Sequence, residues 1–276
     1  MTIIHQPTAL AEFLHNQKVK GLTIGFVPTM GALHKGHLNL IAVSAERCDI
    51  TVCSIFVNPT QFNNRDDFQK YPNRLESDIK MLANSGTNVL FLPPAEAIYP
   101  SGTQHLEHYD LGVLETLLEG KYRPGHFQGV CQVMSRLLRA VQPHYLFMGQ
   151  KDYQQCMVVK KLIEIIGIPT ELVACPTVRE PDGLAMSSRN LRLSPEQRIT
   201  AGQIYKTLLY IRNNTSSLKI EELKKNAQLQ LEEKGFKVDY VEIVDTETLQ
   251  APKNEKPVAL IAAFLGEIRL IDNMTV

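Results

Sequence analysis

Apolar residues follow two different periods along the chain, and the two alternate through its first two thirds. Five short runs rich in β-branched and aromatic residues predict buried strands, at 22–27, 50–57, 88–92, 145–148 and 170–175. Between them, apolar residues recur every three or four positions and predict helices, at 8–17, 37–48, 75–82, 130–141 and 153–166. Strands that alternate with such helices are joined by right-handed crossovers into a parallel sheet. We therefore expect an α/β fold with a Rossmann-like doubly wound parallel sheet.

Turn-forming residues separate these elements. We expect Pro28 and Gly31 to end the first strand, and the polar segment 63–67 to form a surface loop. Chemistry-bearing residues also follow the predicted strands repeatedly, at the carboxyl ends where ligands bind to doubly wound sheets.

The pattern changes after about residue 176. Ser194 and Pro195 are a typical N-cap and first helical residue, and two helices are predicted after them, at 195–213 and 220–234. Three apolar runs then predict a small sheet with a hairpin around Gly266, at 238–244, 258–263 and 267–271. This grouping indicates a smaller C-terminal α+β domain. We therefore expect two domains, 1–176 and 177–276.

Composition narrows the classes of function. The 276 residues contain 29 Lys+Arg and 29 Asp+Glu, and a net charge of zero argues against binding nucleic acid or an anionic membrane as the main activity. The five cysteines include no C-x-x-C pair, which argues against a disulfide framework or a zinc finger and favours reduced thiols. No signal-peptide pattern is visible, and no apolar run reaches the roughly 18 residues of a membrane helix. We expect a cytoplasmic protein.

The first chemical motif is the segment 25–37, in which a buried strand, a turn containing Gly31 and a helix start follow one another. Such an arrangement is an anion site, because unpaired backbone N–H groups and the helix dipole point the same way. His34 and His37 add imidazole donors there, three residues apart. The alternative is that they are surface or capping histidines; a zinc pair is less favoured, since its helical spacing is usually four.

Two further segments follow predicted strands. Asn58 and Gln61 suit a small polar substrate with hydroxyl and carboxylate groups, although a plain turn is the alternative. Gly149 lets a ligand approach the backbone, Lys151 supplies a charge for phosphate, and Asp152 suits either a ligand contact or a purely structural helix cap.

The fourth segment is 178–190, where two serines precede an arginine. Ser187 and Ser188 offer short hydrogen bonds, and Arg189 offers bidentate recognition of phosphate. Asp182-Gly183 marks a turn, so we expect a mobile segment able to close over ATP. The segment 122–127 is a weaker candidate, and a turn leading into a helix is its favoured interpretation.

Taken in order over residues 20–195, the four segments resemble the pantothenate synthetase (pantoate–β-alanine ligase) family. That family lies within a wider group of nucleotidyl-transferring α/β proteins with an H-x-G-H signature, here His-Lys-Gly-His at 34–37. The resemblance implies ATP-dependent condensation of (R)-pantoate with β-alanine through a pantoyl adenylate, giving pantothenate, AMP and pyrophosphate. It also implies Mg²⁺ bound with ATP, no side chain assigned as a metal ligand, a first domain for ATP and pantoate, and a homodimer.

Residue roles carry over from the same resemblance. Gln61 and Gln155 are expected to bind pantoate, and Gln61 also β-alanine. The catalytic residues implied are His34, His37, Lys151, Ser187, Ser188 and Arg189. The ATP-binding residues implied are Met30, Gly31, Ala32, Leu33, His34, Lys35, Gly36, His37, Gly149, Gln150, Lys151, Asp152, Val178, Met186, Ser187, Ser188 and Arg189. Gln150 departs from the family pattern, which commonly has Glu before the lysine; we expect activity to survive this change.

Two other functions compete with this interpretation. A related nucleotidyltransferase would leave AMP on its product and release none with β-alanine. A nucleotide- or RNA-binding module without catalysis is disfavoured by the zero net charge and by the full set of polar residues.

Overall fold

The computed structural model describes residues 1–253 and 256–276. Contacts divide the chain into two compact units. The first unit comprises Met1–Gln150 and Gln154–Pro176, and the second comprises Lys151–Tyr153 and Thr177–Val276. Lys151–Tyr153 therefore groups with the second unit, although the expected division at residue 176 places it in the first.

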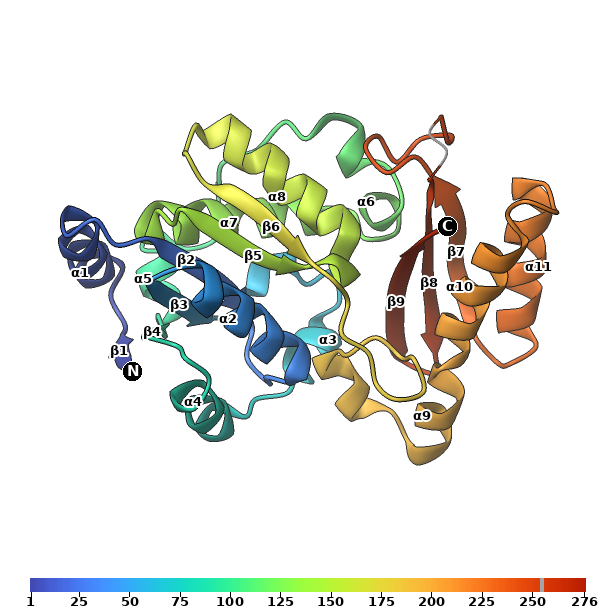
Figure 1. Ribbon diagram of the computed structural model, residues 1–276, viewed down its shortest axis with the longest axis horizontal. Coiled ribbons are helices and arrows are strands. Elements are labelled where there is room, and N and C mark those ends of the chain that lie inside the picture. Colours follow the sequence, from blue (N-terminus) through green and yellow to red (C-terminus); the bar gives the residue numbers. More distant parts are fainter. Residues whose placement is uncertain (254–255) are drawn as a thin grey trace. The chain divides into compact units, whose positions relative to one another are not determined.

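The first unit is built on a six-stranded sheet in the order β1-β4-β3-β2-β5-β6, with every pair parallel (Figure 1). The predicted doubly wound parallel sheet is confirmed. The edge strand β1 was not predicted, because three residues are too short to show a period. The strands are β1 Thr2–Ile4, β2 Ile24–Thr29, β3 Ile50–Ile55, β4 Val89–Phe91, β5 Tyr145–Gly149 and β6 Glu171–Cys175.

Helices cover both faces of this sheet. Neighbouring residues of β2 point to opposite faces, so that Phe26 packs with α1, α7 and α8 while Val27 packs with α2 and α4. The strands are apolar on both sides for this reason. The helices of the first unit are α1 Pro7–Val19, α2 Lys35–Arg47, α3 Arg65–Gln69, α4 Leu75–Ala83, α5 Ala95–Ile98, α6 Glu119–Tyr122, α7 His126–Val141 and α8 Tyr153–Ile166, with 3₁₀ turns η1 Pro59–Gln61, η2 Gly112–Glu115 and η3 Gln150–Asp152.

The order of the strands reverses between β2 and β5. The chain proceeds from β2 through β3 to β4 on one side, and from β5 to β6 on the other. The two central strands pair only at Gly25 and Phe26, and no further pairing joins them toward their carboxyl ends. Doubly wound sheets bind ligands beyond the strands at such a switch point.

Two local predictions for the first unit were wrong. Pro28 does not end the first strand but lies inside β2, paired with Ser54. Its backbone nitrogen falls on the β5 side, where pairing has already stopped after Phe26, so proline removes no hydrogen bond from the ladder. The segment 63–67 is not only a loop, because α3 begins at Arg65 with the Asn64 side chain as its cap, accepting from the Asp66 amide at 2.8 Å.

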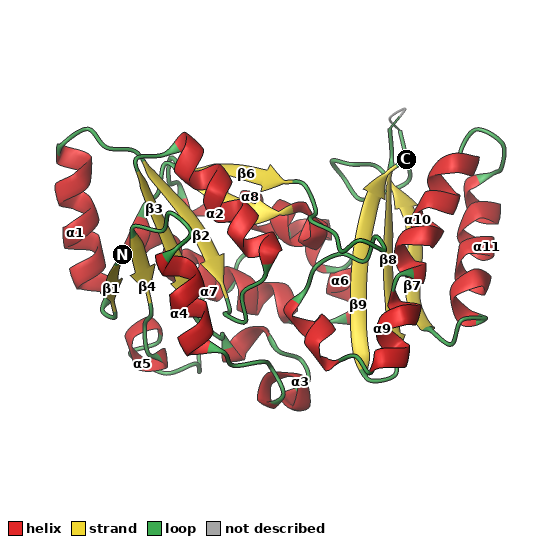
Figure 2. Ribbon diagram, turned by 60° about the horizontal axis from the view of Figure 1, so that its bottom comes forward, coloured by secondary structure: helices red, strands yellow, loops and turns green. Residues whose placement is uncertain are grey.

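The second unit contains an antiparallel sheet with helices packed on one of its faces (Figure 2). The helix predicted over 195–213 is in fact two helices, which are separated at Gly202. A Cβ on Gly202 would lie 3.1 Å from the Asp182 carboxylate. The predicted Ser194 cap and the hairpin at Gly266 are confirmed. The elements are α9 Pro195–Ala201, α10 Gln203–Asn214, α11 Ile220–Glu232, β7 Lys237–Val244, β8 Val258–Leu265 and β9 Ile268–Thr275, with η4 at Ser188–Arg192.

None of the helices in residues 1–253 and 256–276 has both the length and the apolar character needed to cross a membrane.

Candidate active site

A turn held by a buried carboxylate follows β2. Gly31 and Ala32 both have positive φ, +79° and +49°, which is a strained conformation for alanine. Asp78 on α4 is 1% exposed, and its two carboxylate oxygens accept the amide N–H groups of Ala32 at 2.8 Å and Leu33 at 2.9 Å. A Cβ on Gly31 would lie 3.1 Å from the same carboxylate. Asp78, which the sequence did not single out, therefore fixes the backbone of the predicted ATP-binding turn.

The two histidines cap the start of α2. His34 is the N-cap residue, and its Nδ1 accepts the Gly36 amide at 3.1 Å. His37 Nδ1 in turn accepts the His34 amide at 3.3 Å, and the ring centroids are 4.0 Å apart. The capping interpretation is thus confirmed. Because each Nδ1 accepts, a neutral ring carries its hydrogen on Nε2.

A buried asparagine organises the segment after β3. Asn58 is 1% exposed, and its Nδ2 donates to Gln61 Oε1 at 3.1 Å and to the Gly129 carbonyl at 3.0 Å. The hydroxyl of Tyr99 donates to Asn58 Oδ1 at 2.7 Å. Gln61 Nε2 lies 3.1 Å from the Met30 sulfur, so the fold brings the first two predicted motifs together.

The backbone at Gln61 is held from α7. Arg123 Nη1 lies 3.0 Å from His126 Nε2, and since a guanidinium only donates, this ring nitrogen accepts. The other nitrogen, Nδ1, therefore carries the hydrogen and donates to the Gln61 carbonyl at 2.8 Å. The segment 122–127 forms the predicted turn into a helix, but its histidine also reaches a predicted substrate residue.

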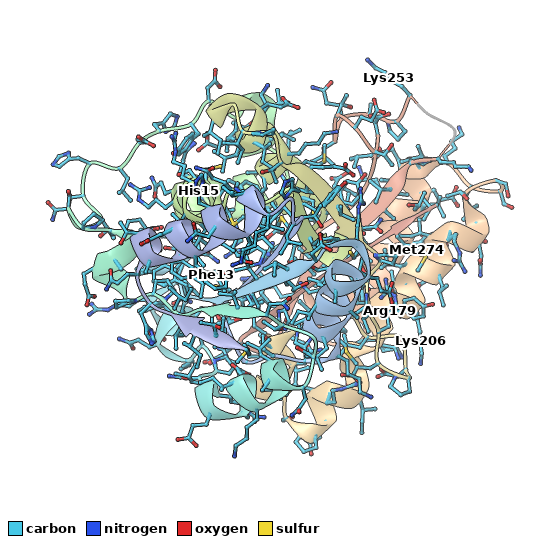
Figure 3. All side chains as sticks on the ribbon, turned by 60° about the vertical axis from the view of Figure 1, so that its left-hand side comes forward. Phe13, His15, Arg179, Lys206, Lys253 and Met274 are labelled. Carbon is cyan, nitrogen blue, oxygen red and sulfur yellow. The ribbon has the colours of Figure 1, made fainter. Side chains whose placement is uncertain are left out.

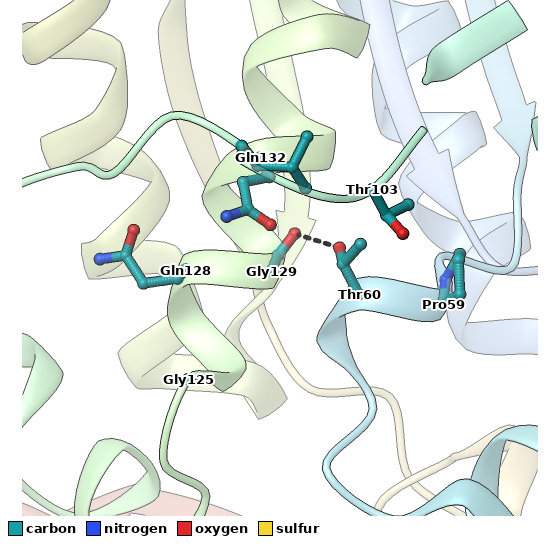
Figure 4. Close-up of a pocket in the computed structure, with 8 residues that line it drawn as sticks. Pro59, Thr60, Thr103, Gly125, Gln128, Gly129 and Gln132 are labelled. Atoms are coloured by element: carbon teal, nitrogen blue, oxygen red, sulfur yellow. Dashed lines mark hydrogen bonds between the residues drawn. The ribbon is translucent and has the colours of Figure 1, made fainter. Parts of the chain in front are cut away.

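An open cavity of about 430 Å³ lies beside η1 and the start of α7 (Figure 4). Thr60 and Gly129 meet at its wall, with Thr60 Oγ1 3.4 Å from the Gly129 carbonyl. None of the predicted site residues lines it. Its lining residues are Pro59, Thr60, Thr103, Leu106, Gly125, Gln128, Gly129 and Gln132.

Two adjacent glutamines at the start of α8 have different environments. Gln154 is 2% exposed and donates to the carbonyls of Leu114 and Leu117, so it supports the fold. Gln155, the predicted pantoate residue, is half-buried. Gly149 ends β5 and Gln150 begins η3, as expected for a segment at the carboxyl edge of the sheet.

In the second unit, Lys151 is anchored at both its ends. Its Nζ lies 2.8 Å from the Asp152 carboxylate, and its side chain is 17% exposed. Its carbonyl accepts from Asn273 Nδ2 on β9 at 2.9 Å. Asp152 thus pairs with the lysine.

The fourth predicted segment is a short hairpin. The Met186 amide donates to the Val178 carbonyl at 3.0 Å, which joins two predicted ATP residues. Gly183 at the tip has φ +90°, and a Cβ there would lie 1.9 Å from the Tyr205 ring. Arg198 binds the Asp182 carboxylate at 2.5 Å and lowers the pKa of that carboxyl.

The serines that follow have distinct roles. Ser187 caps η4, its Oγ accepting the Arg189 amide at 3.3 Å. Ser188 is buried, and Asn190 Nδ2 donates to the Ala185 carbonyl at 3.0 Å, which closes the hairpin onto η4. These hydrogen bonds fix the backbone that carries the hydroxyl groups of Ser187 and Ser188 and the guanidinium group of Arg189.

Among residues 1–253 and 256–276, no three His, Cys, Asp or Glu side chains are grouped to hold a metal ion.

Comparisons with known proteins agree along the chain. A model of the family described as pantoate-beta-alanine ligase matches residues 2–275. The pantothenate synthetase of Azobacteroides pseudotrichonymphae genomovar. CFP2 is 43% identical over 280 residues, covering 99% of this chain and 98% of the relative. That of Porphyromonas gingivalis (strain ATCC BAA-308 / W83) is 41% identical over 279 residues, covering 99% of each.

Two solved structures also match the chain over nearly its whole length. Pantothenate synthetase from Thermus thermophilus has a TM-score of 0.91 and 40% identity, covering 99% of both chains. Pantoate–β-alanine ligase from Francisella tularensis, complexed with beta-gamma ATP and β-alanine, has a TM-score of 0.85 and 38% identity, covering 100% of this chain and 97% of that one. The resemblance drawn from the four motifs is confirmed: the chain belongs to the pantoate–β-alanine ligase family.

Proposed function

We propose that the chain condenses (R)-pantoate with β-alanine in two steps at the expense of ATP. A pantoate carboxylate oxygen attacks the α-phosphorus, and pyrophosphate leaves. The β-alanine amine then attacks the acyl carbon of the pantoyl adenylate, giving the amide and AMP. The observation that carries this proposal is family membership over residues 2–275, together with a relative solved with beta-gamma ATP and β-alanine.

The first step needs neutralised charge more than a nucleophilic side chain, since a carboxylate attacks a polyanion. We assign ATP to the turn at Met30–His37 and to Gly149–Asp152, with Val178 and Met186–Arg189 completing the set. His34 and His37 donate from Nε2 to phosphate oxygens, while capping by Nδ1 fixes their rings. Lys151 and Arg189 supply the fixed positive charges, and the hydroxyls of Ser187 and Ser188 add short hydrogen bonds.

Pantoate is assigned to Gln61 and Gln155, and β-alanine to Gln61. A side-chain amide both donates and accepts, so Gln61 can serve the carboxylate of one substrate and the amine of the other. Asn58 holds Gln61 Oε1 and His126 holds its carbonyl, which supports a positioned rather than a mobile group.

Magnesium enters as part of the MgATP substrate. It lowers the charge on the phosphates that the carboxylate approaches, and the chain's own contribution is the lysine, arginine and histidine donors. Following the family resemblance, we further propose a cytoplasmic homodimer, which light scattering on the purified protein would test.

The experiment is a pyrophosphate- and AMP-release assay in which ATP, Mg²⁺, pantoate and β-alanine are omitted in turn. We expect pyrophosphate to require pantoate, and AMP release to require β-alanine as well. Pantoate labelled with ¹⁸O in its carboxylate should leave one labelled oxygen on AMP, because that oxygen stays bonded to phosphorus. Absence of pantoate-dependent pyrophosphate would overturn the proposal, and a product that retained AMP would favour the nucleotidyltransferase.

A further inference from the structure

Arg179 is the second residue of the fourth segment, and its guanidinium is bound within the second unit. Nη1 and Nη2 donate to the two carboxylate oxygens of Asp272 on β9, at 2.5 and 3.1 Å. Nη1 also donates to the Gly183 carbonyl at 3.0 Å, and Nη2 to the Asn273 carbonyl at 3.3 Å. The guanidinium of Arg179, which is labelled in Figure 3, also stacks 4.5 Å above the ring of Tyr205. Arg179 thus ties the tip of the hairpin to β9.

The next residue on β9 holds the other phosphate-binding element. Asn273 is 4% exposed, and its Nδ2 donates to the Lys151 carbonyl at 2.9 Å. Its own amide donates to Asp272 Oδ1 at 2.8 Å. Two consecutive residues of one strand therefore anchor both the hairpin that leads to Ser187–Arg189 and the backbone of Lys151.

We propose that Arg179, Asp272 and Asn273 are positioning residues that hold Lys151 and the Ser187–Arg189 segment in one frame for the triphosphate. This inference rests on the proposed function, because it assigns ATP to those two elements. β9 is a suitable reference, since it pairs with β8 along its whole length. The Asp272 side chain is 3% exposed, so water cannot replace Arg179 as its partner. Removing Arg179 would therefore leave a buried charge unpaired.

The first test compares Arg179→Lys with Arg269→Lys. Arg269 binds Asp239 at 2.8 Å through a pair whose side chains are both 15% exposed. Arg269 lies on β9, the strand that carries Asp272, so it is a matched control. Lysine keeps the charge in both variants but loses the fork of donors. We expect Arg179→Lys to lower kcat/KM for ATP about 10- to 100-fold, the range for a catalytic group displaced by a fraction of an ångström to one ångström. Arg269→Lys should lower thermal stability alone.

The second test separates positioning from direct contact with ATP. If Arg179 itself bound phosphate, Asp272→Asn would release it from its partner and strengthen ATP binding. Under our proposal the same substitution weakens ATP binding, and Asn273→Ala does so as well while leaving the KM for β-alanine unchanged. Titration calorimetry with ATP and Mg²⁺ measures the affinity, and circular dichroism verifies folding.

The outcomes are distinct. An inactive wild type would refute the proposed function. An active wild type with unchanged ATP kinetics in Arg179→Lys and Asn273→Ala would refute the positioning role, as would tighter ATP binding by Asp272→Asn. Should Asp272→Asn fail to fold, Arg179→Lys and Asn273→Ala still decide the matter.

Discussion

Two turns of the candidate site are each fixed by a buried aspartate distant in sequence, but by different contacts. In the first unit, Asp78 accepts two backbone amides, those of Ala32 and Leu33. In the second unit, Asp272 binds a side chain, Arg179, which then reaches the Gly183 carbonyl. The first clamp, Asp78 on the two amides, needs one charged side chain and a backbone of the right shape. The second clamp, Asp272 on Arg179, needs two matched charges.

This difference sets what each turn tolerates. The first turn depends on close backbone geometry, as its positive φ values indicate, and any change of shape is costly. The second depends on an arginine fork, so a substitution that preserves charge but alters geometry already breaks it. We therefore expect the first region to fail through stability and the second through the placement of ligand groups.

The largest expected effects come from the donors that the two clamps support. We expect His37→Ala in the first region and Lys151→Ala in the second to slow adenylate formation roughly 10²- to 10³-fold, the range for loss of one preorganised donor. Single-turnover pyrophosphate release measures this step. His15→Ala and Lys206→Ala, at exposed positions labelled in Figure 3, are the matched controls. A wild-type rate in either test variant would remove that residue from the mechanism.

Breaking the first clamp should cost the most stability. Asp78→Ala leaves two buried amides without their acceptor, and we expect a loss of about 2–4 kcal/mol in the free energy of unfolding. Asp49→Ala is the control, because Asp49 also accepts a backbone amide, that of Thr23 at 2.8 Å, but from an exposed position just before β3. Denaturant titration compares the two. An equal loss in both variants would show that burial of the Asp78 carboxylate is not what matters.

The sequence predicts the fold and the motifs far better than it predicts the side-chain contacts that fix the motifs in place. Apolar periodicity is sufficient for the parallel sheet, because strands covered on both faces are apolar throughout. Apolar periodicity fails at Pro28. Proline is tolerated there because β5 pairs with β2 only as far as Phe26, and the sequence does not reveal where that pairing ends. Asp78, His126 and Asp272 also escape it, because each acts on a segment at least 45 positions away.

A milder shape change tests the backbone dependence of the first region. A Cβ on Gly129 would lie 2.2 Å from the Thr60 carbonyl oxygen and 2.7 Å from the Gln61 Cα. We expect Gly129→Ala to cost about 1–3 kcal/mol of stability through overpacking and to raise the KM for pantoate. Gln132→Ala on the same helix should stay within about 0.5 kcal/mol. If folded Gly129→Ala kept the wild-type KM for pantoate, then a shift of η1 would not affect the binding role proposed for Gln61.

The smallest effect concerns the exposed ion pair of the second region. Arg198 lowers the pKa of Asp182 from its ordinary 3.8, so the folded protein binds this proton less readily than the unfolded chain. The stability from the pair is therefore complete above that ordinary value and is lost as the pH falls through the lower native pKa. The Asp182 side chain is 39% exposed, and solvent screening limits the contribution to about 0.5 kcal/mol. Asp182→Asn should thus be slightly less stable than wild type in denaturant titrations at pH 7, and the gap should shrink as the pH falls below 3.8 through the lower native pKa. A stability difference that grew in acid would contradict the expected pH dependence. It would also show that the pair of Asp182 with Arg198 does not stabilise the hairpin.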